Sequence, residues 1–194
     1  NEPRIEVSLK ETDMSSVIEE VAAQQSDLGV LFVSDLTESF IRRILDSRNL
    51  EFFGLARLRP HVFLRRGHPL ADCDSITPEE LRAFPSVVFT QRESNLNYAE
   101  EAVVGTGADF NQVVYINDRA TAYNVIAHTD CVSTGSGVLP KGYGDERLVA
   151  IPLSEQVGDM RLGYVKLRGI PLSEHGARFV DILKQIMAEI GEEI

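Results

Sequence analysis

A helical pattern followed at once by an unbroken apolar run is the feature that most constrains the fold. Met14, Val17, Ile18 and Val21 recur at helical spacing and give one apolar face. The stretch 27–33 is then a continuous apolar run that follows a turn. Such a run is typical of a strand buried on both faces, as in a parallel sheet.

The residues ahead of that helix predict a strand. Ile5, Val7 and Leu9 alternate with polar residues across Arg4–Leu9, which is the period of a half-buried strand. Glu11, Thr12 and Asp13 then offer a plausible helix cap. The beginning of the chain therefore predicts a strand–helix–strand unit.

Helical and strand patterns alternate along the rest of the chain. Helices are expected at Thr37–Ser47, from Thr77 with Pro78 at its first position, and at Asn95–Val104, Arg119–His128 and Ser173–Ile190. Strands are expected at Leu50–Leu58, His61–Leu64, Ser86–Thr90, Val113–Ile116, Cys131–Ser133, Leu148–Pro152 and Leu162–Leu167. The last helix should turn five apolar side chains to the core: Phe179, Leu183, Ile186, Met187 and Ile190. This alternation predicts the α/β class with mostly parallel sheets.

Charge and composition exclude several classes of protein. The formal net charge of −11 argues against contact with nucleic acid, which needs a basic surface. No apolar run approaches the roughly 20 residues that a membrane span needs, and no signal peptide precedes Asn1. We therefore expect a cytoplasmic protein. Its two cysteines, Cys73 and Cys131, are expected to be reduced, with a redox switch between them as the alternative.

One polar loop lies where a strand leads into a helix. In open α/β sheets, ligands bind beyond the carboxyl ends of strands, and helix N-termini attract anions. The loop after Ser86–Phe89 meets both conditions, and it offers hydroxyls, amides and a guanidinium. Its candidate binding residues are Thr90, Gln91, Arg92, Ser94 and Asn95. A solvated loop with a helix cap at Ser94 or Asn95 is the alternative.

A glycine-rich turn is the second candidate, because small residues let a ligand approach the backbone closely. Its residues are Thr134, Gly135, Ser136 and Gly137. The alternative is a tight turn that only packs. It is not a phosphate loop, because no Lys-Ser or Lys-Thr pair follows at the required spacing.

Three further residues are candidates by position. Ser34 and Asp35 come directly after the 27–33 strand, although Asp35 could equally cap the next helix. Arg119 begins another helix and could bind a carboxylate bidentately, while Asp118 before it is best interpreted as the helix cap.

No pattern in the chain indicates catalysis, a metal or a cofactor. His61, His68, His128 and His175 are scattered, without the close spacing of a zinc site. The Gly-x-Ser-x-Gly nucleophile elbow is missing, because Gly135-Ser136-Gly137 has the wrong spacing. We expect no catalytic residues, no metal site and no cofactor.

Several short motifs, in a particular order along the chain, resemble those of one protein family. Arg57–Leu70 resembles the strand that leads to a His-Pro-Leu-Ala turn, which Ala71 completes. Asp27-Leu28-Gly29-Val30 resembles the family's Asp-Leu-(Ala/Gly)-Ile strand, and Ile76–Phe84 the helix after the turn. Gly135–Pro140 is similar to the family's glycine turn. The chain from Leu148 onward is similar to the family's closing segment. Taken together, these motifs resemble those of the LysR-type transcriptional regulators, and the resemblance covers essentially the whole chain.

The resemblance implies the fold of the family's regulatory domain. Two Rossmann-like lobes would be joined by two crossover strands, as in type II periplasmic binding proteins. Lobe I would comprise residues 1–70 plus 153–194 and lobe II residues 71–152, with crossovers near Arg65–Leu70 and Pro152–Gly163. The winged helix-turn-helix and the domain's usual first strand and helix have no counterpart in this chain.

The resemblance also implies a function. A small-molecule effector, which Arg92 and Arg119 suggest is an anion, would bind between the lobes and shift their arrangement. DNA would be bound only by a separate N-terminal module, and the chain would form a homodimer or homotetramer through surfaces such as Val17–Ala22 and Tyr123–Ala127. The alternatives are a periplasmic-type solute-binding protein and a small α/β enzyme.

Overall fold

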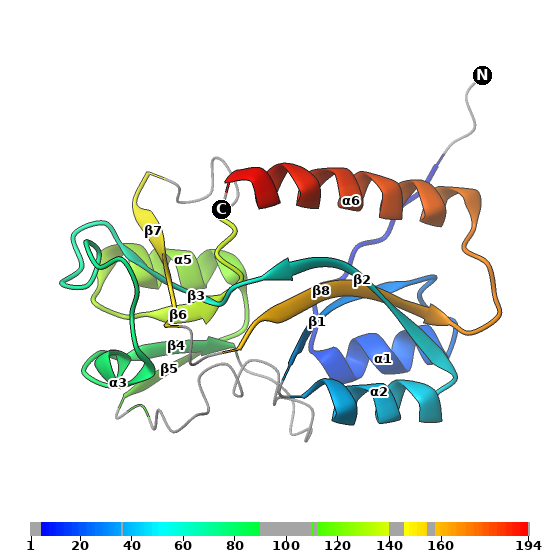
Figure 1. The fold of residues 1–194 in the computed structure, drawn as a ribbon, viewed down its shortest axis with the longest axis horizontal. Coiled ribbons are helices and arrows are strands. Elements are labelled where there is room, and N and C mark those ends of the chain that lie inside the picture. Colours follow the sequence, from blue (N-terminus) through cyan, green and yellow to red (C-terminus); the bar gives the residue numbers. More distant parts are fainter. Residues whose placement is uncertain are drawn as a thin grey trace.

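The computed structural model describes residues 5–35, 37–89, 110, 112–139, 146–154 and 158–193. Within these residues the strands form two three-stranded sheets and one strand pair (Figure 1). The first sheet has the order β1-β8-β2, from β1 (Gly29–Ser34), β8 (Met160–Leu167) and β2 (Leu50–Leu58). The second has the order β6-β3-β7, from β6 (Ser133–Gly135), β3 (His61–Arg65) and β7 (Leu148–Pro152).

Helices cover both faces of the first sheet (Figure 1). α1 (Met14–Ala22) and α2 (Glu38–Ser47) lie on one face, and α6 (Glu174–Glu193) lies along the other. Asp13 caps α1, because its Oδ1 accepts a hydrogen bond of 3.0 Å from the backbone N–H of Ser16. The predicted helices in this half therefore form.

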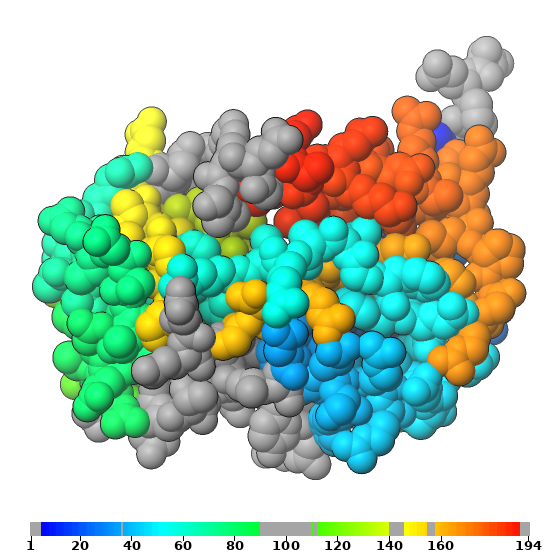
Figure 2. Space-filling model, in the orientation of Figure 1, coloured from blue at the N-terminus to red at the C-terminus, as the bar shows by residue number. Residues whose placement is uncertain are grey.

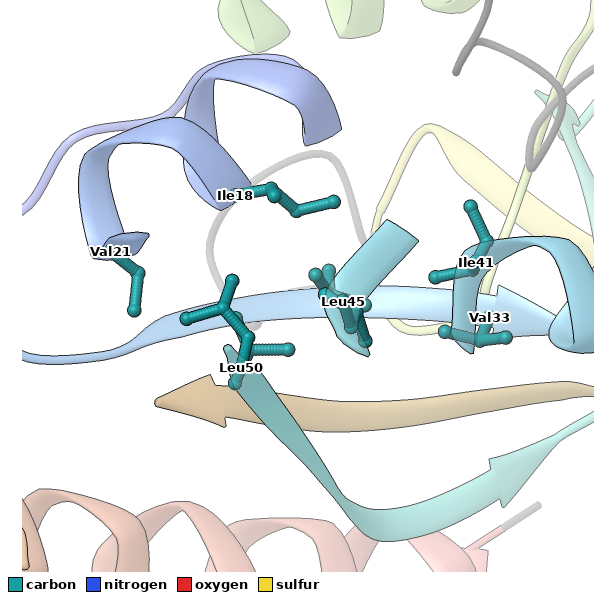
Figure 3. Close-up of a cluster of buried hydrophobic side chains, with 8 residues drawn as sticks. Ile18, Val21, Val33, Ile41, Leu45 and Leu50 are labelled. Carbon is teal, nitrogen blue, oxygen red and sulfur yellow. The ribbon is translucent and has the colours of Figure 1, made fainter. Parts of the chain in front are cut away.

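A hydrophobic cluster fixes α1 and α2 on the sheet (Figure 3). Ile18 and Val21 point from α1 toward the sheet, and Ile41 and Leu45 point from α2. Each of these four side chains is at most 3% exposed. Burying a large aliphatic side chain contributes about 1.5–3 kcal/mol, so this cluster holds the two helices firmly.

The strand pair and two helices accompany the second sheet. β4 (Ser86–Phe89) and β5 (Val113–Ile116) pair in parallel, and a bridge from Ser86 to Val132 joins β4 to the start of β6. α5 (Arg119–His128) packs against β3, β4 and β7. The short α3 (Pro78–Leu81) begins with a complete capping box in which Thr77 and Glu80 bond reciprocally.

The expectation of mostly parallel sheets is wrong for the described residues. β8 returns between β1 and β2 and is antiparallel to both, and β3 is antiparallel to β6 and β7. Only β4 and β5 pair in parallel as strands. A continuous apolar run shows that both faces of a strand are buried, but it does not reveal the direction of its neighbours.

The predicted strand over Arg4–Leu9 does not form in residues 5–9. This stretch takes no regular structure, and Ile5, Val7 and Leu9 are 56%, 75% and 86% exposed. Alternation supplies the side-chain pattern of a strand, but a strand also needs a neighbour for its backbone hydrogen bonds. Among the described strands, none lies against this segment.

Two further elements differ from the expectation. The strand predicted at Cys131–Ser133 lies two residues later, as β6. On α6, Met187 is buried and Leu183 and Ile190 are partly buried, whereas Phe179 and Ile186 are 37% and 45% exposed. Figure 2 shows that α6 rests on the sheet with its outer face uncovered in this view. The apolar stripe along α6 is wider than the area that its contact with the sheet covers. The apolar pattern therefore predicts more buried side chains than this contact provides.

The chain crosses between the two sheets at two places. β3 pairs with β6 and β7, so the first crossing lies at Arg59 and Pro60, between β2 and β3. The second lies between β7 and β8, over residues 153–159. The predicted lobe I included residues up to 70, so the sheets place His61–Arg65 on the other side of that boundary. The division into lobes itself stays a prediction.

Candidate functional site

Ser34 ends β1 and is only 3% exposed. Its Oγ lies 2.9 Å from Oγ1 of Thr37 and accepts a 3.2 Å hydrogen bond from the Thr37 backbone N–H. The Ser34 hydroxyl is therefore engaged in the turn that begins α2. As a candidate binding residue, Ser34 would have to give up this turn contact to meet a ligand.

Asp35, the next residue, lies in an ion-pair network at the end of the first sheet. Arg57 on β2 donates from Nη2 to Asp35 at 2.7 Å and from Nε to Asp159 at 2.6 Å. The Asp35 backbone N–H also donates to the Asp159 carbonyl at 3.2 Å. The hydrogen bond to Asp159 raises the pKa of Arg57. This arrangement joins the end of β1, β2 and the segment before β8.

Arg161 extends the same network. It donates to Glu38, the first residue of α2, and its Nη2 lies 3.8 Å from Oδ1 of Asp35. Hydrogen bonding to Arg42, together with Arg161, lowers the pKa of Glu38. The Nε of Arg161 is buried without a hydrogen-bond partner among the described residues. With Arg42, which pairs with Glu38, the network contains three guanidinium groups and three carboxylates, so its formal charges balance.

α5 begins on the side of the second sheet. Oδ1 of Asp118 accepts a 2.8 Å hydrogen bond from the Thr121 backbone N–H, which makes Asp118 the cap that its position indicated. The hydrogen bonds from Thr121 lower the pKa of Asp118. One of the free N–H groups at this helix terminus is therefore satisfied by the Asp118 side chain.

Arg119 contacts groups from distant parts of the chain. Its guanidinium carbon lies 5.6 Å from the ring centroid of Phe89, which is a cation–π distance. Its Nε donates to Oε1 of Glu11 at 3.0 Å, and Nη2 donates to the same oxygen. Burial alone would lower the pKa of Arg119, but hydrogen bonds to Glu11 and Tyr123 outweigh it and raise the pKa.

Glu11 was interpreted from the sequence only as part of a helix cap. The residues of the pair are 108 positions apart, so no local pattern connects them. Arg119 was a candidate because it begins a helix. The partner of Arg119 is evident only in the folded structure, where the start of α1 lies beside the start of α5.

The glycine turn packs tightly against β3. A Cβ on Gly135 would lie 2.5 Å from Cε2 of Phe63, and one on Gly137 would lie 2.5 Å from Nδ1 of His61. Thr134 pairs with Val62 within the sheet, and Ser136 accepts a 3.4 Å hydrogen bond from the Val138 N–H. Packing thus explains both glycines, and the half-buried Ser136 stays a candidate for a ligand contact.

The other predicted loop lies outside the described residues. It contains Thr90, Gln91, Arg92, Ser94 and Asn95. Phe89, the last residue of β4, is described and lies beside Arg119. Figure 1 shows β1 and β4 running toward the middle of the molecule from opposite sides. The contact with Phe89 thus brings the end of β4 beside the start of α5.

A separate cavity of about 260 Å³ lies between α2 and β2. Its floor is the apolar core of the first sheet, including Ile41 and Leu45, and its rim carries charged groups. None of the predicted binding residues lines this cavity. The full lining is Val33, Glu38, Ile41, Arg42, Leu45, Asp46, Leu50, Glu51, Phe52 and Arg168.

A metal site, a disulfide and a membrane-spanning helix each place requirements on the described residues. No group of three or more His, Cys, Asp or Glu residues within it could hold a metal ion. Cys73 and Cys131 are free thiols, and Cys131 is buried. No helix in the described ranges combines the length and the apolar character that would be needed to cross a bilayer.

The family model of the LysR substrate binding domain matches residues 1–188. This chain belongs to that family. Its fold is accordingly the α/β architecture of these domains, with two sheet-based halves joined by two crossings. The match spans both sheets, the candidate network at Asp35 and the Arg119 contacts, so it applies to the whole described structure.

Solved structures of the same kind share the fold of this LysR-family domain. A putative LysR family transcriptional regulator, PA01 protein from Pseudomonas aeruginosa, is 18% identical with a TM-score of 0.63, over 92% of this chain and 59% of that chain. The effector binding domain of QuiR in complex with shikimate is 16% identical with a TM-score of 0.61, over 91% and 78%. The BenM effector binding domain with benzoate is 14% identical with a TM-score of 0.61, over 94% and 78%.

The extent of these matches differs. The chain spans 59% of the length of the Pseudomonas aeruginosa regulator, but more than three quarters of the two effector binding domains. No curated protein sequence matches the chain significantly.

Proposed function

We propose that this chain is the effector-sensing domain of a LysR-type transcriptional regulator. A small molecule binds between its two halves and shifts their relative arrangement. A separate N-terminal module binds DNA, and the regulator works in the cytoplasm as a homodimer or homotetramer without catalysing a reaction. The observation that carries the proposal is the family match over residues 1–188.

The connections between the two sheets support a hinge. The described helices and strands pack mainly within their own sheet, and the chain crosses only at Arg59–Pro60 and 153–159. Phe32 and Met160 extend the shared core beneath these crossings. Few contacts between two halves allow their angle to change at low cost, which an effector that prefers one arrangement can exploit. We place the lobe boundary at the crossings.

The polar groups that face the middle of the molecule support a binding site. Asp35 follows the end of β1 and pairs with Arg57 on β2, whereas Arg119 at the start of α5 lies over the Phe89 ring at the end of β4. Asp35, Arg119 and Ser136, together with the polar loop that contains Arg92, form the proposed effector site. Two structural neighbours hold benzoate and shikimate, both carboxylates, which favours a small anionic effector here.

The proposal is tested by screening metabolites against the purified domain by thermal shift, followed by calorimetry of each hit. A true effector should raise Tm, and its affinity should fall at least about tenfold in Arg119→Met, as for loss of a charge-assisted bond. Arg178→Met, a change on the exposed face of α6, is the matched control and should bind normally.

Two outcomes would contradict this function. Chemical conversion of any hit by the purified domain would favour an α/β enzyme. A full-length gene that encodes a secretion signal in place of a DNA-binding module would favour a solute-binding protein. A screen in which no metabolite of any charge binds would also count against the sensor.

A further inference from the structure

The ion pair between Glu11 and Arg119 connects parts of the molecule that otherwise hardly touch. Glu11 lies just before α1, which packs on the first sheet, whereas Arg119 begins α5, which packs on the second. Apart from the two crossings and the core beneath them, the described helices and strands make their contacts within their own half. This ion pair is therefore a direct contact between the two halves, outside the crossings.

The geometry shows how Arg119 is presented. The Phe89 ring covers one face of the guanidinium at 5.6 Å. Both Nε and Nη2 point along one edge to a single oxygen, Oε1 of Glu11. That edge is the one that arginine uses for bidentate binding of a carboxylate or phosphate. The donors are thus pre-aligned for an oxyanion, and Glu11 fills only part of their capacity.

Arg119 differs from the other arginines near the middle of the molecule. Arg57 pairs with Asp35 and Asp159, and Arg161 pairs with Asp35 and Glu38, so each of these two arginines already has two carboxylates beside it. Among the described residues, Arg119 forms an ion pair with Glu11 alone. In a chain of net charge −11, an incoming anion needs a local cation that few carboxylates shield. Arg119 is the better suited of the three.

Glu11 is weakly held in its place. Its side chain is 64% exposed, and it belongs to a stretch, 5–13, with no regular structure. Asp118 already caps α5, so the helix does not depend on Glu11. An exposed ion pair of this kind shifts an equilibrium only about 1.4- to 5-fold. A ligand can therefore displace Glu11 easily.

We propose that Glu11 is an internal stand-in for the anionic group of the effector. Without effector, its carboxylate occupies the donor edge of Arg119. The effector carries a carboxylate or a similar oxyanion that takes this edge, and Glu11 leaves the second half of the molecule. Binding thereby exchanges a contact between the halves for a contact with the ligand. This inference rests on the proposed sensor function and adds the charge class of the ligand and a self-occupied site.

The test follows the Arg119 side chain directly by NMR. The Nε–Hε signal of Arg119 is assigned in the ¹⁵N-labelled chain by its loss in Arg119→Lys. Sodium benzoate and potassium phosphate are then titrated at constant ionic strength, with benzamide as the neutral analogue of benzoate. The variants are Glu11→Gln and, as a control on the same segment, Glu6→Gln, which removes an exposed carboxylate outside any ion pair of the described residues.

At least one anion should shift the Arg119 signal to saturation, whereas benzamide should not. Its Kd should fall about 1.4- to 5-fold in Glu11→Gln, because the competing carboxylate is gone, and should stay at the wild-type value in Glu6→Gln. Equal Kd values in the two variants would overturn the proposal. So would an Arg119 signal that responds to neither anion.

The result also separates this inference from the proposed function. A neutral or cationic metabolite that stabilises the domain without moving the Arg119 signal would preserve the sensor and overturn the stand-in role of Glu11. A domain that binds no metabolite at all would overturn the sensor itself.

Discussion

Gly137 lies directly against the ring of His61. A Cβ at this glycine would come within 2.5 Å of Nδ1, and its φ of 83° is in the left-handed region that side chains disfavour. His61 cannot move away freely, because its Nδ1–H donates to the Arg59 carbonyl at 2.7 Å and only 6% of the residue is exposed. The turn after β6 and the first crossing are therefore packed as one unit.

Gly137→Ala should destabilise the domain. The left-handed backbone alone costs a side chain about 1–3 kcal/mol, and the contact with His61 adds to this loss. Gly54→Ala is the matched control, because a Cβ there meets nothing within 4 Å. Urea unfolding of both variants measures the difference. Equal stability of the two would show that the turn can move away from β3.

The Arg57 network should depend on salt. Arg57→Met removes the ion pairs to Asp35 and Asp159, yet these groups are largely exposed, so Tm should fall by no more than about 3 °C. The fall should shrink at 1 M NaCl, where the Debye length is about 3 Å. Thermal melts at low and high salt, with Arg178→Met as control, measure this. A loss of Tm that salt does not change would indicate a packing role for the Arg57 stem.

His68 should make the fold less stable in mild acid. Its Nδ1 accepts a 3.1 Å hydrogen bond from the Leu70 N–H, and Nε2 lies 3.3 Å from the Asp130 carbonyl, so the neutral ring fits the site. Burial lowers the pKa of His68 in the folded chain. The unfolded chain then binds the proton more readily, so stability is full above about pH 6.5 and declines as the pH falls below it.

Thermal melts from about pH 7.5 to pH 5.5 check this direction. His68→Asn removes the titrating ring but keeps an acceptor for Leu70, so Tm should fall less over this range than in the wild type. Burial also lowers the pKa of His61, so part of the decline in Tm should remain in His68→Asn, with the same sign. His175→Asn, at an exposed position on α6, should keep the wild-type slope. An unchanged slope in His68→Asn would assign the decline to other groups.

Substitution by lysine at two neighbouring residues of α6 should reduce the stability of the domain to very different extents. Ile186 is 45% exposed, so Ile186→Lys should change the free energy of unfolding by no more than about 0.5 kcal/mol. Met187 is 7% exposed within the core formed with Leu58 and Leu162. Met187→Lys buries an unpaired charge and should cost about 3 kcal/mol or more. Denaturant unfolding of the two variants distinguishes them, and similar losses would mean that the outer face of α6 is also covered.

Much of the local structure could be predicted from the sequence. The amphipathic pattern predicted α1 and α2, and Thr77-Pro78 predicted the start of α3, where the structure adds a capping box between Thr77 and Glu80. These features depend on neighbours within one or two turns. The cap at Asp118 was also predicted, because the bond from Thr121 spans three residues. For Arg119 the sequence supplied a position and a charge, but not Glu11 as its partner.

Other predictions failed where distant parts of the chain decide the outcome. Ile5, Val7 and Leu9 have the period of a strand, but a strand forms only where another backbone supplies its hydrogen bonds. The apolar run of β1 is typical of a parallel strand, yet β8, from the other end of the chain, pairs with it in the opposite direction.

The sequence alone determined most of the described helices and strands, the acidic character of the chain and, through short motifs in a particular order, its family. Helix caps depend on hydrogen bonds between residues close in the sequence, and helices and strands on the spacing of apolar side chains. Both can be recognised in a sequence. Only the tertiary structure decided that β3 joins the second sheet, that the glycines at 135 and 137 serve the packing of β3, and that Glu11 meets Arg119. Such contacts follow from how separate segments pack, and no local pattern records which carboxylate a folded chain will bring to a given arginine.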